Sequence, residues 1–186
     1  MTGLRATAVG FAGALVIELP AYADDRGLFK ETYVRTKYRS LGIDDEFVQD
    51  SVSYSGRGVL RGLHADPRMS KLVQVLHGTA FDVIADARAG SPTFGCWQGF
   101  ALSADDHRQL YVPTGFLHGF VALTDDVVFS YKQGAQYDPT REIGVRWDDP
   151  VLNIEWPAIE PLRISGKDRA NLSFIEAFGG AQCNAS

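Results

Sequence analysis

The chain is short of cysteine and of positive charge. Its 186 residues include only two cysteines, Cys96 and Cys183, and their separation of 87 positions fits no zinc or redox motif. A disulfide-dense miniprotein is therefore excluded, and we expect both residues to be incidental thiols in a reducing compartment. Lysine and arginine total 18 against 23 aspartates and glutamates, a net charge of −5, and the basic residues form no run. Binding to a nucleic-acid backbone is thus not expected.

Long apolar runs are also missing. The apolar stretch near the start, residues 6–17, is diluted by Gly10 and Gly13 and is followed by Glu18 and Pro20. The small residues at 21–23 imitate the cleavage site of a signal peptide, but residues 15–17 fit a buried first strand equally well. We favour the strand and predict a cytoplasmic protein. Since no stretch reaches the length of a membrane span, no membrane partner is expected.

Several motifs of catalysis and cofactor binding are absent or incomplete. Gly56, Gly58 and Gly62 miss the dinucleotide fingerprint by one residue and precede no predicted helix. The Gly-Lys pair at 166–167 has no Walker glycine upstream, and no Gly-x-Ser-x-Gly segment occurs. The four histidines include no His-x-His pair, the spacing that would place two imidazoles on one face of a strand to hold a metal. We therefore expect no metal and no cofactor.

The sequence does contain a regular series of short strands. Runs rich in β-branched and aromatic residues recur every 8 to 12 residues, with turn residues between most of them. The predicted strands are residues 14–19, 28–35, 47–54, 59–63, 72–77, 80–86, 95–102, 109–112, 119–123 and 127–132. Helical signals are confined to 36–41 and 172–178. This pattern predicts a single all-β domain over residues 1–186, an antiparallel jelly-roll sandwich or barrel with a few short helices, in which residues 179–186 fray.

Polar residues interrupt several of these otherwise apolar strands. Gln49 lies in one of them, Arg61 and His64 in the next, and Asp82 in a later one. Burying such groups is costly unless a ligand or another residue satisfies them. Taken singly, each one is more often part of a solvated face or a salt bridge, and a residue such as His118 could simply support the fold. Their density nevertheless favours a binding site between the sheets.

A dozen short sequence blocks follow one another between residues 14 and 172. They include Asp25-Arg26-Gly27, Gly58-Val-Leu-Arg-Gly-Leu-His64, Gly90-Ser-Pro-Thr-Phe-Gly95, Gly115-Phe-x-His-Gly-Phe120, Trp147-x-Asp-Pro150, Ile154-x-Trp-Pro157 and Ser165-x-Lys-Asp168. In this order the blocks resemble the dTDP-4-dehydrorhamnose 3,5-epimerase family. The resemblance implies a cupin-like jelly roll that forms a homodimer and uses neither metal nor redox cofactor. The implied substrate is a nucleotide-linked 4-keto-6-deoxy hexose, which is inverted at C3 and C5.

The resemblance also implies four catalytic residues. His64 is the base that removes a carbon-bound proton, and Asp168 fixes the imidazole tautomer and stabilises the imidazolium that forms. Lys71 stabilises the enolate oxygen with a positive charge. Tyr131 donates a proton from the other side of the sugar, since a phenol with an ordinary pKa of about 10 is protonated at neutral pH.

The same blocks imply the residues that bind the substrate. Arg26, Arg61 and Lys167 match positions near the nucleotide and its diphosphate, which guanidinium and ammonium groups suit. The other matching positions are Glu31, Gln49, Asp50, Ser51, His118, Tyr137 and Glu142. Arg26 could instead form a surface ion pair, and Tyr137 could belong only to a turn. Because the chain is acidic overall, we expect the three cations to converge with Lys71 in one pocket.

The chain departs from the family pattern close to the expected base. Only six residues separate His64 from Lys71, where the family has a longer segment with an aromatic residue directly after the histidine. Ser51 stands where asparagine is common, and the tyrosine that the family often has just before Tyr137 is missing. The short segment resembles relatives that act on other nucleotide sugars, including GDP-linked 4-keto heptoses. A C3-only epimerase, a GDP-4-keto-heptose epimerase, a non-catalytic sugar-binding jelly roll and a metal-dependent cupin therefore stay open as alternatives.

Overall fold

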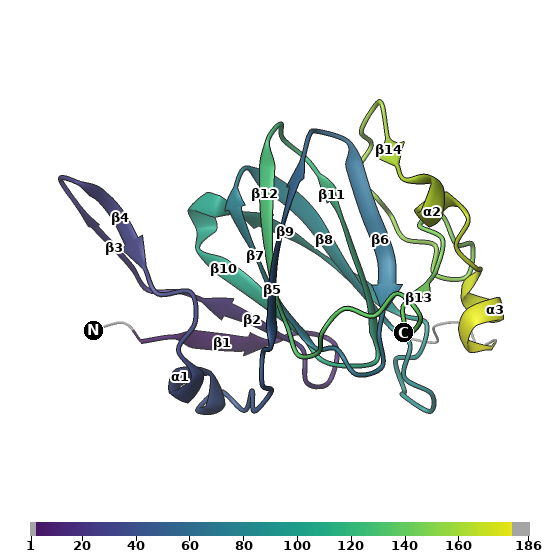
Figure 1. The fold of residues 1–186 in the computed structure, drawn as a ribbon, viewed down its shortest axis with the longest axis horizontal. Coiled ribbons are helices and arrows are strands. Elements are labelled where there is room, and N and C mark those ends of the chain that lie inside the picture. Colours follow the sequence, from purple (N-terminus) through teal and green to yellow (C-terminus); the bar gives the residue numbers. More distant parts are fainter. Residues whose placement is uncertain (1–2, 180–186) are drawn as a thin grey trace.

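Two β-sheets face each other in the computed structural model, which describes residues 3–179 (Figure 1). Short helices lie at the periphery of this sandwich. The prediction of an all-β, cupin-like jelly roll with a few short helices is confirmed. The fraying predicted for residues 179–186 concerns, apart from Gly179, residues outside the described range.

The first sheet has six strands in the order β1-β2-β10-β7-β12-β5. In that order the strands are β1 (Arg5–Ala8), β2 (Leu15–Glu18), β10 (Arg108–Val112), β7 (Lys71–His77), β12 (Val127–Gln133) and β5 (Gln49–Ser55). All neighbours in it are antiparallel. Strand β5 therefore lies at the edge of the sheet, with β12 as its neighbour.

The second sheet packs against the first. Its strands are β13 (Ile143–Gly144), β6 (Val59–Ala65), β11 (Phe116–Ala122), β8 (Thr79–Asp86) and β9 (Trp97–Ser103), with β14 (Arg163–Ile164) also paired to β6. The β14–β6 pair is parallel and the other neighbours are antiparallel. Strand β6 thus has β11 on one side and two short C-terminal strands on the other.

A two-stranded hairpin and three short helices complete the described chain. The hairpin consists of β3 (Ala21–Asp24) and β4 (Gly27–Lys30) and projects away from the sandwich (Figure 1). The helices are α1 (Arg35–Arg39), α2 (Gly166–Arg169) and α3 (Phe174–Phe178), and η1 (Ala104–Asp106) is a single 3₁₀ turn. None of these helices has the length and apolar character needed to cross a membrane.

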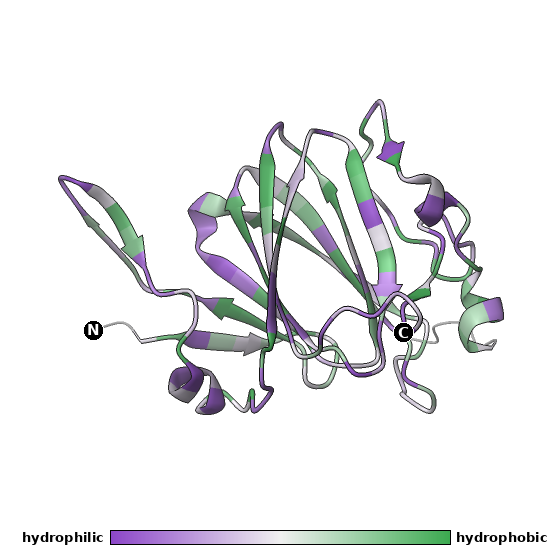
Figure 2. Ribbon diagram, in the orientation of Figure 1, coloured by the Kyte–Doolittle hydropathy of each residue, from purple (hydrophilic) through white to green (hydrophobic). Residues whose placement is uncertain are grey.

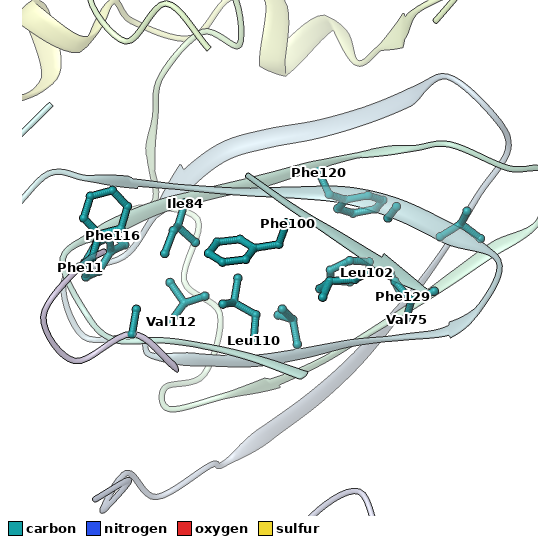
Figure 3. Packing of buried hydrophobic residues seen from close by; sticks show 14 of the residues in the cluster. Phe11, Val75, Ile84, Phe100, Leu102, Leu110, Val112, Phe116, Phe120 and Phe129 are labelled. Atoms are coloured by element: carbon teal, nitrogen blue, oxygen red, sulfur yellow. The ribbon is translucent and has the colours of Figure 1, made fainter. Parts of the chain in front are cut away.

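The main core lies between the two sheets and consists of side chains from alternate strand positions, as the period of a strand requires (Figure 3). Phe120 of β11 stacks on Phe129 of β12 with ring centroids 4.3 Å apart, which joins the sheets directly. Cys96 is buried within this core and is disulfide-bonded, so the prediction of a thiol at this position is wrong. Cys183 lies outside the described residues.

Asp86, at the end of β8, holds the following loop with a fully buried carboxylate. It accepts hydrogen bonds from the Arg88 guanidinium (2.7 and 2.8 Å) and from the hydroxyls of Ser91 and Thr93 (both 2.6 Å). Burial alone would raise the pKa of Asp86, but these donors lower it to about 2. The ionised carboxylate of Asp86 is thus more stable in the folded chain than in the unfolded chain.

Asp86→Asn is expected to reduce the free energy of unfolding at pH 7 by about 2 kcal/mol, because a folded-state pKa depressed from about 4 to about 2 contributes roughly that amount. This stability is present above about pH 4 and is lost as pH falls toward 2, so wild type and variant should converge in acid. Urea unfolding at pH 7 and pH 3 measures the difference. Asp105→Asn, at an exposed position, is the control and should change stability by less than about 0.5 kcal/mol. Equal stability of Asp86→Asn and wild type at pH 7 would contradict the prediction.

Candidate active site

A cavity of about 690 Å³ opens between the sheets, next to the apolar core. Its position follows from the alternation of side chains along the central strands. On β12, Phe129 belongs to the core and Tyr131 lines the cavity. On β11, Phe120 belongs to the core and borders the cavity, and His118, two positions earlier, lines it. The sandwich interior therefore changes from apolar to polar within two residues of each strand. The volume of the cavity is in the range that holds small-molecule ligands.

His64 and Asp168 form a hydrogen-bonded pair in this cavity. The distance from His64 Nε2 to Asp168 Oδ1 is 2.7 Å, and the two side chains are 24% and 6% exposed. Asp168 is positioned by α2, where its backbone N–H donates to the N-cap side chain of Ser165 (3.0 Å). Burial would raise the pKa of Asp168, but the bond to His64 and the N–H of Gly62 outweigh it and lower the pKa. Asp168 is thus an anion that orients the imidazole.

Glycines allow the two histidine-bearing strands to approach each other. Gly62 of β6 has φ +123°, and a Cβ there would lie 2.6 Å from the Cα of Gly119 on β11. The β6–β11 register shifts between His118 and Phe120, and His118 pairs with His64 across the strands. Such irregularities redirect side chains and occur often beside active sites. Here the close approach brings two histidines to one cavity wall.

Lys71 and Tyr131 bring a cation and a phenol to the same cavity. Lys71 Nζ donates to the backbone oxygen of His64 (3.3 Å). Burial lowers the pKa of Lys71 to about 8, although nearby carboxylates oppose the effect. Tyr131 Oη lies 3.2 Å from the Ser53 hydroxyl, and burial raises the pKa of its phenol. Near neutral pH the cavity therefore contains an ammonium group and a protonated phenol.

Most of the substrate-binding residues predicted from the sequence also line this cavity. They are Gln49, Ser51, Arg61, His118, Tyr137, Glu142 and Lys167. Lys167 forms an ion pair with Glu142. The structure does not bring Arg26, Glu31 or Asp50 to the cavity. Asp50 lies on the outer face of β5, where it pairs with Lys132 (2.8 Å).

Arg26 and Glu31 belong to the projecting hairpin and its continuation. Arg26 is 85% exposed and pairs with Asp24, whereas Glu31 pairs with Lys37 of α1. Within this chain the predicted convergence of cations therefore includes Arg61, Lys71 and Lys167 but not Arg26.

The cavity also contains residues that the sequence interpretation did not select. Gln133 accepts hydrogen bonds from Gln49 (3.1 Å) and Ser51 (2.8 Å), so three polar side chains form one cluster. Gln133 follows Tyr131 by two positions, and strand alternation could have identified it. Arg163 lies on the two-residue strand β14, which is too short to show any periodicity. Met69 of the short segment between His64 and Lys71 lines the cavity as well.

Comparisons with known proteins give a consistent result. The family model for dTDP-4-dehydrorhamnose 3,5-epimerase matches residues 8–176. The dTDP-4-dehydrorhamnose 3,5-epimerase of Pseudomonas aeruginosa is 42% identical over 177 residues, which are 94% of this chain and 98% of the relative. The enzyme of that name from Streptomyces griseus is 46% identical over 162 residues, or 84% and 80% of the two chains.

Solved structures are also similar to this chain. The crystal structure of the dTDP-6-deoxy-D-glucose-3,5-epimerase of Legionella pneumophila, in complex with dTDP-4-keto-L-rhamnose, superposes with a TM-score of 0.90. It is 40% identical and covers 97% of this chain and 100% of its own. Sequence and fold thus agree over nearly the whole length. The chain belongs to the dTDP-4-dehydrorhamnose 3,5-epimerase family and is an isomerase.

Proposed function

We propose that this protein inverts C3 and C5 of a dTDP-linked 4-keto-6-deoxy hexose by proton transfer. The observation that carries the proposal is the arrangement of two proton-transfer groups on facing sheets of one cavity. His64, bonded to Asp168, lies on β6 of the second sheet, and Tyr131 lies on β12 of the first. A sugar between them would meet a base on one side and an acid on the other, as inversion requires. Because only protons move, the reaction needs no redox cofactor.

The first step is removal of a proton next to the C4 ketone. Asp168 accepts the Nε2–H of His64, which leaves the lone pair of Nδ1 free to take the proton from carbon. The electrons of the broken C–H bond form a carbon–carbon double bond, and the carbonyl oxygen becomes an enolate. The carboxylate of Asp168 then stabilises the imidazolium that has formed.

The second step returns a proton to the opposite face. The ammonium of Lys71 stabilises the enolate oxygen until a new C–H bond forms. Tyr131 is protonated over the whole physiological range because burial raises its pKa, so its O–H can donate to carbon and reform the ketone. Solvent restores the phenol and removes the proton from His64. Repetition at the other carbon completes a 3,5-epimerisation.

The diphosphate of the substrate is proposed to bind at Arg61 and Arg163. Within residues 3–179, neither guanidinium pairs with a carboxylate, although most arginines of this acidic chain do. Arg61 donates to the Ser55 hydroxyl (3.1 Å) and to a backbone carbonyl, and Arg163 lies beside Gly56 in the same turn. Two uncompensated guanidiniums at one cavity wall suit the two phosphates of a nucleoside diphosphate.

Arg163→Gln is expected to weaken dTDP binding about tenfold while kcat changes less than about twofold, because a charge-assisted hydrogen bond to an anion is lost away from the reacting carbons. Titration calorimetry with dTDP and steady-state kinetics measure the two effects. Arg57→Gln is the matched control, since Arg57 is exposed near the same turn and does not line the cavity. Wild-type dTDP affinity in Arg163→Gln would contradict this assignment.

A homodimer would bring Arg26 of the hairpin, which lies away from the cavity of its own chain, to the cavity of the other chain. The hairpin projects from the sandwich, and its ribbon carries hydrophobic residues (Figure 2). Leu28 and Phe29 of β4 are 52% and 66% exposed. Large exposed apolar residues of this kind are typical of an interface. We therefore propose that the hairpin of each protomer packs on its partner and delivers Arg26 to the partner's cavity. Light scattering should give twice the monomer mass, and Phe29→Asp should shift it toward the monomer.

Proton exchange at the substrate tests the proposed reaction. In deuterium oxide, the wild-type protein should introduce deuterium at C3 and C5 of the dTDP-linked 4-keto sugar, as followed by NMR, and invert both centres. Exchange at C3 alone would identify a C3-only epimerase, and preference for a GDP-linked substrate would identify a different nucleotide specificity. No exchange with dTDP, GDP, UDP or CDP substrates would reject the epimerase function and favour a binding module.

A further inference from the structure

Asp82 is a fully buried carboxylate with an unsatisfied oxygen. Its Oδ1 lies 2.8 Å from Nε2 of His118, and its side chain has no solvent exposure. Oδ2 has no hydrogen-bond partner among the described residues. An unsatisfied buried polar atom costs free energy, and more when the group is charged. Stability alone therefore does not explain an aspartate at this position.

Asp86 on the same strand shows that the fold can satisfy such a group. Asp82 and Asp86 are four residues apart on β8, so they face the same side of the sheet, and both have zero exposure. Both oxygens of Asp86 accept hydrogen bonds, from Arg88 and from two hydroxyls. The two aspartates thus differ in surroundings rather than in burial: Asp86 stabilises a loop, whereas Asp82 contacts a residue of the cavity wall.

His118 connects Asp82 to the cavity. It is 4% exposed, lines the cavity, and packs against Phe129 and Tyr131 with ring centroids 6.2 and 6.3 Å away. Because Nε2 is bonded to Asp82, the nitrogen left for a ligand is Nδ1, which has no hydrogen-bond partner within residues 3–179. The aspartate and the packed rings therefore restrict both the tautomer and the rotation of this imidazole.

Asp82 also acts on the cation that faces the enolate. The charged groups around Lys71 are Glu142 from the segment before β13, Asp82 from β8 and Asp66 from the segment after β6. His64 contributes its backbone oxygen, and His118 and Tyr131 share the cavity. Of the three carboxylates, Glu142 already pairs with Lys167 and Asp66 with Arg68. Asp82 is the one without a cationic lysine or arginine partner in the described chain.

We propose that Asp82 is a positioning residue for the epimerisation: it holds His118 with Nδ1 toward the substrate's C4 oxygen, and its buried charge balances the ammonium of Lys71. Two groups would then meet the developing enolate, one from β11 and one from β7, both held by a carboxylate that never contacts the substrate. The inference rests on the proposed epimerase function. It assigns a separate role from that of Asp168, which orients the base.

The charge-balancing role predicts a change in pH dependence. Burial lowers the pKa of Lys71 to about 8, and Asp82 is one of the groups that oppose this effect. Removing the Asp82 charge should lower the pKa of Lys71 further, so the ammonium is lost at a lower pH. The alkaline limb of the kcat profile should therefore move to lower pH, a change that a purely structural residue would not cause.

The test compares Asp82→Asn with Asp86→Asn, which removes an equally buried carboxylate from the same strand. For Asp82→Asn we expect kcat to fall about tenfold, KM to change less than about threefold, and the alkaline limb to move down by at least about half a pH unit. Asp86→Asn should lower the melting temperature and leave the limb in place. The proposal would be overturned if the alkaline limb of the kcat profile were the same in Asp82→Asn and wild type, or if it shifted equally in Asp82→Asn and Asp86→Asn.

A second measurement is independent of turnover. Nitrogen-15 NMR of the wild-type protein without substrate should show His118 in one tautomer, protonated at Nε2 while neutral, whereas the exposed His77 should show a mixture. A mixture at His118 in the wild type would overturn the proposal even if Asp82→Asn does not fold. If the wild type exchanges no substrate protons but His118 has a fixed tautomer, the proposed function fails while the Asp82–His118 arrangement stands.

Discussion

His64→Ala is expected to abolish hydrogen exchange at both C3 and C5 and to lower kcat about 10²- to 10⁴-fold, the usual contribution of a general base. The reason is structural: Asp168 holds one imidazole in a cavity that accommodates one sugar, and the same base then serves both carbons. Deuterium incorporation at each carbon, followed by NMR, measures the two rates separately. Binding of dTDP should be nearly unchanged, because the imidazole acts at the sugar.

Two further variants make this expectation specific. Asp168→Asn keeps the shape of the carboxylate but removes its charge, so we expect a similar loss of exchange with normal dTDP binding. His77→Ala removes an exposed histidine at the end of β7 and should leave both rates unchanged. Persistent exchange at one carbon in His64→Ala would show that a second base serves that position, and the single-base mechanism would be wrong.

The strands of the sandwich could be predicted because their signal is periodic. The expected run at 72–77 corresponds to β7, that at 80–86 to β8 and that at 127–132 to β12, each within one residue at either end. Their alternation also predicts which residues face inward, and the polar inward positions line the cavity. The pattern at 28–35 predicts one strand, but β4 ends at Lys30 and α1 begins at Arg35. Tyr33, which suggested a strand, packs instead against Tyr38 and Phe47.

Short elements and the placement of the hairpin could not be predicted in this way. Strands β13 and β14 have two residues each, and α2 has four, so none of them shows a period. Asp168 and Arg163 are on such elements, and they reach the cavity because this C-terminal segment pairs with β6. Pairing between distant segments is a property of the whole fold. The same holds for Arg26, whose place depends on where the hairpin packs.

Tyr131→Phe is expected to separate proton removal from inversion. His64 and Asp168 remain in place, so the base still forms the enolate, and Lys71 still stabilises it. Without the phenol, the enolate recovers a proton mainly from the side of His64, which restores the original configuration. The product should therefore be starting sugar that carries deuterium, with inversion reduced about 10²- to 10⁴-fold relative to wild type.

The ratio of inverted to unchanged deuterated sugar is the quantity that decides this prediction, and NMR gives it from the separate H1 signals of the two sugars, because C1 is not exchanged. Tyr54→Phe, at a tyrosine that is 76% exposed on β5, removes a hydroxyl outside the cavity and should keep the wild-type ratio. Inversion at the wild-type rate in Tyr131→Phe would place the acid elsewhere. If Tyr131→Phe loses both exchange and inversion, the phenol takes part in enolate formation. In the proposed mechanism exchange needs only the base and Lys71, so that result would contradict it. Tyr131, on the sheet that faces His64, can thus be assigned to the return of the proton. His64→Ala should therefore lose both exchange and inversion, whereas Tyr131→Phe should keep exchange and lose inversion.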